Sequence, residues 1–205
     1  MTLDQFRPLA EKGLSPFVRA ANALGLSPDG VSVIAFACAV AAGVAFGLAP
    51  PSEAPLSYVA GSAFVLANGW LDLVDGALAR AQGTDSSGGD LLDHVLDRYA
   101  DIAVLVGLAA GIGRYGLGLA AVTGVLMTSY LGTQIQAVGI GREYGGLLGR
   151  ADRLALVGIV GVVAAAVPDP LVGGLGVVGL LLVVFAIVGH LTALQRFRGA
   201  WADIG

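Results

Sequence analysis

Four aspartates in the middle of the chain have the residue type and the spacing of a cluster that could bind a divalent cation. Asp72 and Asp75 are three residues apart, and Asp93 and Asp97 are four residues apart. On helices, spacings of three and four place both members of a pair on one face. Carboxylates that converge without cations cannot all stay ionised, and oxygen-rich clusters favour hard divalent ions, of which Mg²⁺ is the usual one. The spacing therefore predicts a metal site if two helix ends bring the pairs together.

The segments that must position these aspartates are strongly apolar. Of the 205 residues, 56% are hydrophobic and only 13% are charged, whereas soluble domains carry about a quarter charged residues. This composition excludes an ordinary soluble enzyme, a disordered protein and a coiled coil. The net charge of −4 argues against a nucleic-acid partner. We expect an all-α integral membrane protein, in which carboxylates within the spans mark function.

Six apolar stretches are long enough to cross about 30 Å of hydrocarbon at about 1.5 Å per residue. We place them near residues 30–49, 57–80, 90–112, 115–138, 152–168 and 171–194. Before them, apolar residues at helical spacing predict an amphipathic helix on the membrane surface, interrupted near Pro16; a packed soluble cap is the alternative. The predicted organisation is a juxtamembrane segment over residues 1–29 and a six-helix domain over residues 30–198.

The positive charges predict the orientation of these spans. With both termini in the cytoplasm, nine basic residues lie on or near the cytoplasmic side, whereas Arg114 lies outside. The nine are Arg7, Lys12, Arg19, Arg80, Arg142, Arg150, Arg153, Arg196 and Arg198. We therefore expect a multi-pass protein of the cell membrane whose aspartate cluster faces the cytoplasm.

The residues around the aspartates form a longer pattern with fixed spacing. They read Asp72-Leu-Val-Asp75-Gly76-Ala-Leu-Ala79-Arg80, then eight residues, then Gly89-Asp-Leu-Leu-Asp93-His-Val-Leu-Asp97. This resembles the CDP-alcohol phosphotransferase motif, D-x-x-D-G-x-x-A-R-x8-G-x3-D-x3-D, at all eight fixed positions. The resemblance implies transfer of a phosphatidyl-type group from a CDP-linked lipid to an alcohol, with release of CMP. Six spans, cytoplasmic termini and a homodimer also fit that family.

The resemblance also implies roles for individual residues. Asp72, Asp75, Asp93 and Asp97 resemble the ligands of Mg²⁺ or Mn²⁺, with two ions per site, and Asp97 matches the general base for the acceptor hydroxyl. The CDP-lipid would be bound by Asp72, Gly76, Ala79, Arg80 and Gly89. Without the motif, the carboxylates could instead be structural, with Arg80 and Arg98 as ion-pair partners. Arg98 and Asp101 lie outside the fixed positions, and we expect an ion pair for both.

A second, shorter resemblance lies before the first span. Ser27-Pro28-Asp29-Gly30-Val31-Ser32 is similar to the Pro-Asn-x-x-Thr-type loop of the family. It implies that Pro28 and Ser32 help to hold the CDP-lipid. Ser27 or Asp29 would also cap the first span, with Pro28 in its first turn.

The acceptor site resembles that of one branch of the family, the phosphatidylinositol-phosphate and archaetidylinositol-phosphate synthases. Residues 149–154 read Gly-Arg-Ala-Asp-Arg-Leu, similar to an E-R-x-E-R segment, which implies that Arg150 and Arg153 bind the phosphate of inositol phosphate. Two arginines three residues apart at a helix start suit an anion, and Arg196 would add a third contact. The residues after Tyr130 read Leu-Gly-Thr-Gln, where this branch usually has Lys-Ala-Arg.

Three functions remain open at this stage. The first is a lipid synthase with an anionic acceptor, inositol phosphate before glycerol phosphate. The second is the same chemistry with serine as the acceptor. The third is a cation transporter lined by the four aspartates, which would not need Gly76, Ala79 and Gly89 at fixed spacing. The donor would be CDP-archaeol or CDP-diacylglycerol, and the sequence does not choose between them.

Overall fold

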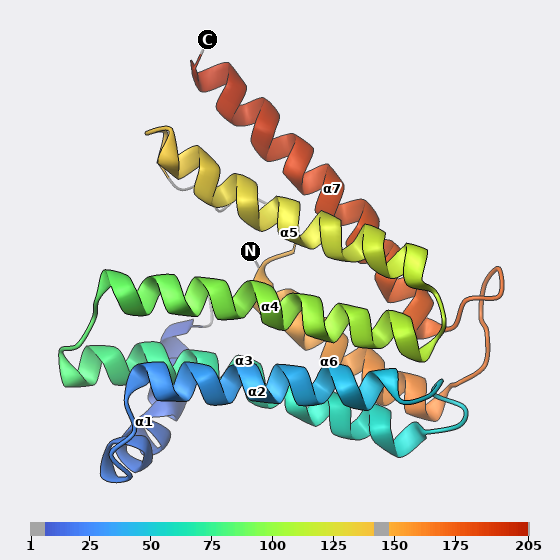
Figure 1. Cartoon of the computed structure of the whole chain (residues 1–205), viewed down its shortest axis with the longest axis horizontal. Coiled ribbons are helices and arrows are strands. Elements are labelled where there is room, and N and C mark those ends of the chain that lie inside the picture. Colours follow the sequence, from blue (N-terminus) through green and yellow to red (C-terminus); the bar gives the residue numbers. More distant parts are fainter. Residues whose placement is uncertain (1–6, 142–147, 205) are drawn as a thin grey trace.

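The structure, a computed structural model, describes residues 7–141 and 148–204, and the named elements in this part of the chain are all helices (Figure 1). Its helices are α1 (Arg7–Ala23), α2 (Pro28–Gly47), α3 (Pro55–Gln82), α4 (Ser87–Gly111), α5 (Tyr115–Ala137), α6 (Arg150–Ala166) and α7 (Val177–Ile204). The expected all-α class is confirmed. Arg142, one of the expected cytoplasmic charges, lies outside the described residues.

The exterior of the bundle has the apolar character of a membrane protein. Among the described residues, three helices, α2, α5 and α7, are long and apolar enough to cross a membrane. Large apolar side chains such as Val44, Leu119 and Ile159 are 60–66% exposed. Such a surface suits lipid contact, because hydrocarbon is the solvent of a spanning helix. The count of six spans remains a prediction.

Two local expectations were wrong. The first helix is not interrupted near Pro16, because α1 runs through this residue. Proline removes one helical hydrogen bond, but its fixed φ is helical, and Leu14 and Ala21 on either side of it are buried in a cluster with α3. The last helix begins at Val177 rather than near residue 171. Gly173 and Gly174 have φ of 56° and 76° there, a left-handed turn that a helix cannot contain.

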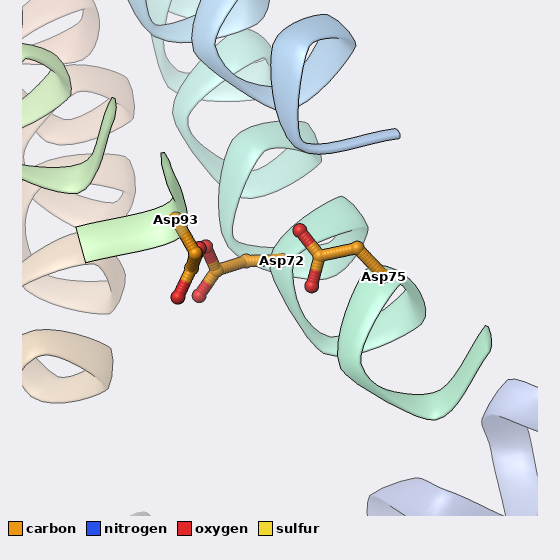
Figure 2. Close-up of side chains that lie close together, drawn as sticks. All are labelled: Asp72, Asp75 and Asp93. Carbon is orange, nitrogen blue, oxygen red and sulfur yellow. The ribbon is translucent and has the colours of Figure 1, made fainter. Parts of the chain in front are cut away.

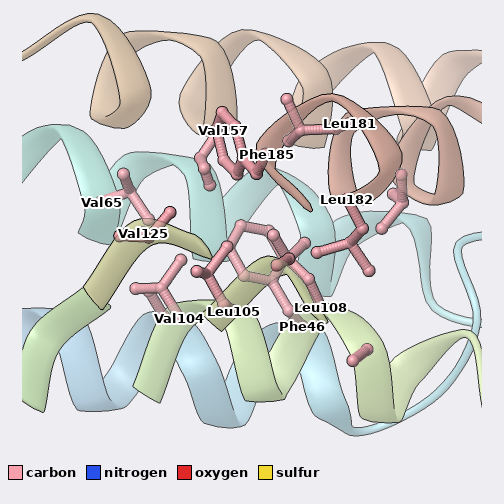
Figure 3. Close-up of a cluster of buried hydrophobic side chains, with 14 of the residues drawn as sticks. Phe46, Val65, Val104, Leu105, Leu108, Val125, Val157, Leu181, Leu182 and Phe185 are labelled. Carbon is pink, nitrogen blue, oxygen red and sulfur yellow. The ribbon is translucent and has the colours of Figure 1, made fainter. Parts of the chain in front are cut away.

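The helices form one core to which six of them contribute. α2 packs against α3 and α4, α3 against α6, and α5 against both α4 and α7. Figure 3 shows buried side chains of these helices meeting around Phe46 and Leu108. Both side chains are 0% exposed, as is Val65 on α3. α1 lies outside this core and packs on α3 (Figure 1).

The close approach of α2 and α4 depends on small residues. A Cβ atom on Gly107 of α4 would collide with the backbone of Gly43 on α2. Small residues let membrane helices pack through their backbones, where no hydrophobic effect drives association. The contact lies near the C-terminal ends of α2 and α4, whereas the aspartates of α4 lie near its N-terminal end, so it fixes how the two helices cross away from the site.

Candidate active site

Three of the four motif aspartates converge in the structure. Asp72 and Asp75 lie on α3 and Asp93 lies on α4, and one carboxylate oxygen of each lies within 4.8 Å of the others. Figure 2 shows these side chains turned toward one space between the two helices. The connection between α3 and α4 is short, and Ser86 caps α4 by accepting a 3.1 Å hydrogen bond from the Gly89 amide. Motif spacing and a short loop therefore build the cluster.

The donor set of this cluster fits a divalent cation. Its ligands are carboxylate oxygens only, which suit Mg²⁺ or Mn²⁺. Asp75 is 6% exposed, and Ser32 on α2 donates a 2.6 Å hydrogen bond to its Oδ2. Because a buried carboxylate needs compensation, the hydroxyl helps to fix Asp75. Ser32 was expected at the CDP-lipid, and its hydrogen bond also orients Asp75, a member of the acidic cluster.

The fourth aspartate, Asp97, is not part of this group of three. Its Oδ1 lies 2.7 Å from Nη2 of Arg150, the first residue of α6. Nη1 of the same arginine donates a 2.6 Å hydrogen bond to Oδ2 of Asp72. Arg150 thus joins a member of the acidic cluster to the expected base.

A second set of ion pairs lies one helical turn after Asp97. Asp101 accepts a 3.2 Å hydrogen bond from Nη2 of Arg153 on α6. Nη2 of Arg98 lies 3.8 Å from Asp101, so the expectation that each of the two residues forms an ion pair is confirmed. Sequence reasoning missed the bond from Arg153, because no local pattern relates α4 to α6.

Arg196, the third arginine expected at the acceptor, lies in another contact. Its Nη1 donates a 2.6 Å hydrogen bond to the carbonyl of Thr128 and so ties α7 to α5. The structure places Arg150 beside the acidic cluster. It places Arg153 beside Asp101, one helical turn after Asp97 on α4. Whether Arg153 and Arg196 bind an acceptor stays a prediction.

A cavity of about 700 Å³ opens onto the aspartates. It is lined by all seven residues expected at the CDP-lipid, which are Pro28, Ser32, Asp72, Gly76, Ala79, Arg80 and Gly89. Asp75, Asp93, Asp97 and Arg150 line it as well. The cavity therefore collects the whole motif around one space.

One wall of this cavity is apolar and was not expected. Leu66 and Trp70 on α3 and Leu154 on α6 line it. Trp70 is held by an edge-on contact with Phe17 of α1, with ring centroids 5.2 Å apart. A cavity with carboxylates at one side and apolar side chains at the other suits a ligand with a charged head and a lipid tail. No separate pattern marks this wall, since apolar residues fill all the long helices.

The loop before α2 performs the capping role expected of it. Ser27 accepts a 3.1 Å hydrogen bond from the Gly30 amide, and Pro28 stands in the first turn of α2. Ser32 then points from the same helix to Asp75. The start of α2 can therefore cap the helix and line the cavity at once, because Ser27, Pro28 and Ser32 all lie within it.

Comparison with known sequences gives concordant matches. The model of the CDP-alcohol phosphatidyltransferase family matches residues 26–194. Archaetidylinositol phosphate synthase of Methanothermobacter thermautotrophicus is 32% identical over 203 residues, which are 97% of this chain and 94% of that protein. Phosphatidylinositol phosphate synthase of Mycolicibacterium smegmatis is 35% identical over 198 residues, covering 93% of this chain and 84% of that protein.

Solved structures show the same similarity. A crystal structure of Mycobacterium tuberculosis phosphatidylinositol phosphate synthase in complex with manganese and citrate has a TM-score of 0.76 at 25% identity, over 92% of this chain and 88% of that one. Another crystal structure of that synthase, with CDP-DAG bound, has a TM-score of 0.74 at 26% identity, over 92% and 93% of the two chains. The structural similarity thus covers nearly the full length of this chain and of the synthase.

Proposed function

Because this chain belongs to the CDP-alcohol phosphatidyltransferase family, we propose that it transfers the phosphatidyl-type group of a CDP-linked lipid to inositol phosphate and releases CMP. The observation that supports this acceptor is the contact of Arg150 with Asp97: Nη2 of the arginine lies 2.7 Å from the carboxylate expected to act as base. A fixed cation beside the base suits an acceptor that carries its own phosphate. The relatives named for archaetidylinositol phosphate and phosphatidylinositol phosphate synthesis support the same choice.

The donor would lie in the cavity with its nucleotide at the motif and its tail along the apolar wall. Gly76, Ala79 and Gly89 leave space for the nucleotide, and Arg80 can bind a phosphate with two hydrogen bonds. Leu66 and Trp70 would contact the lipid chains. CDP-archaeol and CDP-diacylglycerol would each fit a cavity with a polar side for the head group and an apolar wall for the lipid chains.

The carboxylates would hold the divalent cations that the family requires. Asp72, Asp75 and Asp93 have the oxygen geometry for an ion, and we assign Asp97 as a further ligand of a two-ion site. When bound, the ions neutralise the pyrophosphate and stabilise the charge that develops on the leaving group. Ser32 keeps Asp75 oriented through its 2.6 Å hydrogen bond.

The chemical step assigned to this site is a single displacement at phosphorus. The acceptor hydroxyl loses its proton to Asp97, and its oxygen forms a bond to the phosphorus of the lipid phosphate. The bond between that phosphorus and the oxygen of CMP breaks, so CMP leaves with the electron pair. Arg150 would hold the acceptor phosphate so that the hydroxyl reaches Asp97, and positioning of this kind is a large part of catalysis of phosphoryl transfer.

The membrane arrangement belongs to the same proposal. We place six spans in the domain of residues 30–198, with both termini and the active site on the cytoplasmic side and a juxtamembrane segment over residues 1–29. The excess of arginine at the expected cytoplasmic ends supports this orientation. A homodimer is expected from the family resemblance.

The acceptor can be tested directly by CMP release. Purified protein would be incubated with Mg²⁺ or Mn²⁺, with CDP-archaeol or CDP-diacylglycerol, and with inositol phosphate, free inositol, glycerol phosphate or serine. We expect CMP with inositol phosphate and little with free inositol, which differs only in lacking the phosphate. A preference for glycerol phosphate or serine would mean that this alcohol, and not inositol phosphate, is the acceptor. Cation flux without release of CMP would overturn the proposal that the protein is an enzyme.

A further inference from the structure

Asp101 is a buried carboxylate that the reaction described above does not use. It lies on α4 one turn after Asp97, outside the fixed positions of the motif, and is 6% exposed. A carboxylate in the interior of a membrane helix is costly and is retained for a function. Its contacts indicate what that function is.

Three guanidinium groups surround this carboxylate. Nη2 of Arg153 donates a 3.2 Å hydrogen bond to it. Nη2 of Arg98 lies 3.8 Å from Oδ2, and Nε of Arg150 lies 4.0 Å from Oδ1. Arg98 comes from the same helix as Asp101, whereas the other two come from the first turn of α6. One carboxylate therefore contacts both arginines expected at the acceptor phosphate, of which Arg150 lines the cavity of about 700 Å³.

The guanidinium of Arg150 has carboxylates on three sides. Its Nη1 and Nη2 face Asp72 and Asp97 at 2.6 and 2.7 Å, and its Nε faces Asp101. At this distance of 4.0 Å Nε makes no hydrogen bond, so Asp101 acts on it as a nearby negative charge. Because a guanidinium is planar and its donors have fixed directions, the carboxylates at Nη1, Nη2 and Nε together favour one orientation of the group.

Arg153 has a donor left over in this arrangement. Its side chain is 9% exposed, and its Nε is buried with no hydrogen-bond partner in the described part of the chain. Nε of Arg98 is likewise buried and has no hydrogen-bond partner among the described residues. Buried donors without a partner are rare in folded proteins, and oxygens of a bound anion would satisfy them.

We infer that Asp101 is a positioning residue for the acceptor phosphate: it holds Arg150 and Arg153 in the orientation in which their remaining donors receive that phosphate. This inference rests on the proposed function, because it assumes a phosphorylated acceptor. Asp101 does not touch the acceptor itself. It acts through the two arginines, and its effect belongs to acceptor binding rather than to the donor or to the ions.

The test compares Asp101→Asn with the wild-type protein in CMP release, at varied inositol phosphate and varied CDP-lipid. Asparagine keeps the size but loses the charge. We expect the acceptor KM to rise about tenfold or more, equivalent to about 1.4 kcal/mol of binding, with the CDP-lipid KM little changed. Asp101→Glu, which keeps the charge and displaces it by one methylene, should raise the acceptor KM less. Asp169→Asn, an exposed carboxylate between α6 and α7, is the matched control and should behave as wild type.

A double variant separates positioning from a general loss of structure. If Asp101 acts through Arg153, then Asp101→Asn combined with Arg153→Ala should cost clearly less than the product of the two separate fold-changes. If the two substitutions instead caused independent structural damage, their fold-changes in acceptor KM would multiply. Protection of each variant by inositol phosphate against thermal unfolding, measured without CDP-lipid, gives a readout that does not depend on turnover.

The outcomes distinguish this inference from the proposed function. If the wild type does not use inositol phosphate or another phosphorylated acceptor, both are overturned. If the wild type uses it but Asp101→Asn keeps the wild-type acceptor KM, only the role of Asp101 is overturned. If Asp101→Asn does not fold, Asp101→Glu decides: a rise in acceptor KM relative to donor KM supports the role, and an unchanged ratio overturns it.

Discussion

Arg150 and Asp97 form a 2.7 Å ion pair that joins the start of α6 to α4. The same guanidinium donates to Asp72, a member of the acidic cluster. One cation therefore touches both the expected base and an expected metal ligand. This places the acceptor side of the cavity and the metal side in direct electrostatic contact.

The first prediction follows from that contact. Arg150→Gln removes a charge-assisted hydrogen bond of about 1.5–3 kcal/mol from a bound phosphate, which corresponds to about 10- to 150-fold in apparent acceptor affinity. It also removes the cation that competes for Asp72, so Mg²⁺ or Mn²⁺ should bind more tightly. Acceptor KM and metal titration of the same variant measure the two effects.

Arg114→Gln is the matched control for Arg150→Gln. Arg114 is exposed at the other end of α4 from the aspartates. The acceptor KM and the affinity for the metal ion should both stay at their wild-type values in this control. A weaker metal affinity in Arg150→Gln would show that the arginine organises the acidic cluster instead of competing for it.

The second prediction concerns metal removal. Chelation should abolish CMP release, and Asp75→Asn or Asp93→Asn should weaken the binding of the ion and of the CDP-lipid together, because the ion links the carboxylates to the pyrophosphate. Thermal stabilisation of the protein by the metal should be lost in both variants. Asp203→Asn, at the exposed end of α7, serves as the control. Activity that survives thorough chelation would be incompatible with this site.

The third prediction separates Asp97 from the three clustered aspartates. Asp97→Asn should lower turnover by about 10²-fold or more if the carboxylate takes the proton of the acceptor hydroxyl. CDP-lipid binding should suffer less than in Asp75→Asn, because Asp72, Asp75 and Asp93 still converge. Single-turnover kinetics and CDP-lipid binding measure the two effects separately. Turnover close to that of the wild type would remove Asp97 from the role of base.

The parts of the site that could be predicted from sequence are those built by local geometry. The spacing of three places Asp72 and Asp75 on one face of α3, and the short loop to α4 brings Asp93 beside them. Ser27 as a cap and the pair of Arg98 with Asp101 also follow from positions along one helix or its start.

The parts that could not be predicted depend on packing between distant helices. The bonds from Arg150 to Asp72 and from Arg153 to Asp101 join α6 to α3 and α4, and no spacing in the sequence encodes that contact. The continuity of α1 through Pro16 likewise depends on the burial of Leu14 against α3. Local propensity favours a break there, and tertiary packing prevails over it.

The fourth prediction tests the crossing of α2 and α4. Gly107→Ala introduces a Cβ atom into the backbone of Gly43, and overpacking of this kind costs about 1–3 kcal/mol. The variant should therefore unfold at a lower temperature in detergent. Gly116→Ala is the control, because its Cβ would have no neighbour within 4 Å and alanine is the better helix former. Equal stability of the two variants would mean that the helices can separate at this point without cost.

The last prediction concerns the anionic acceptor. Arg153→Ala should raise the KM for inositol phosphate or glycerol phosphate by about 10- to 150-fold, the value of one charge-assisted hydrogen bond. The KM for the CDP-lipid should change little, since its pyrophosphate is assigned to Arg80 and the metal ions.

Arg153→Ala also leaves Asp101 without its hydrogen-bonded partner, and removing one partner of a buried pair destabilises a fold. Arg153→Lys, which keeps the charge but not the planar fork, should therefore recover stability with only part of the acceptor affinity. Arg198→Ala, an exposed arginine on α7, controls for the general loss of positive charge and should leave the acceptor KM unchanged. If free inositol or serine is used as well as inositol phosphate, and Arg153→Ala keeps the wild-type acceptor KM, the acceptor is not anionic. A neutral or zwitterionic alcohol then takes its place, bound beside Asp97 without the arginines.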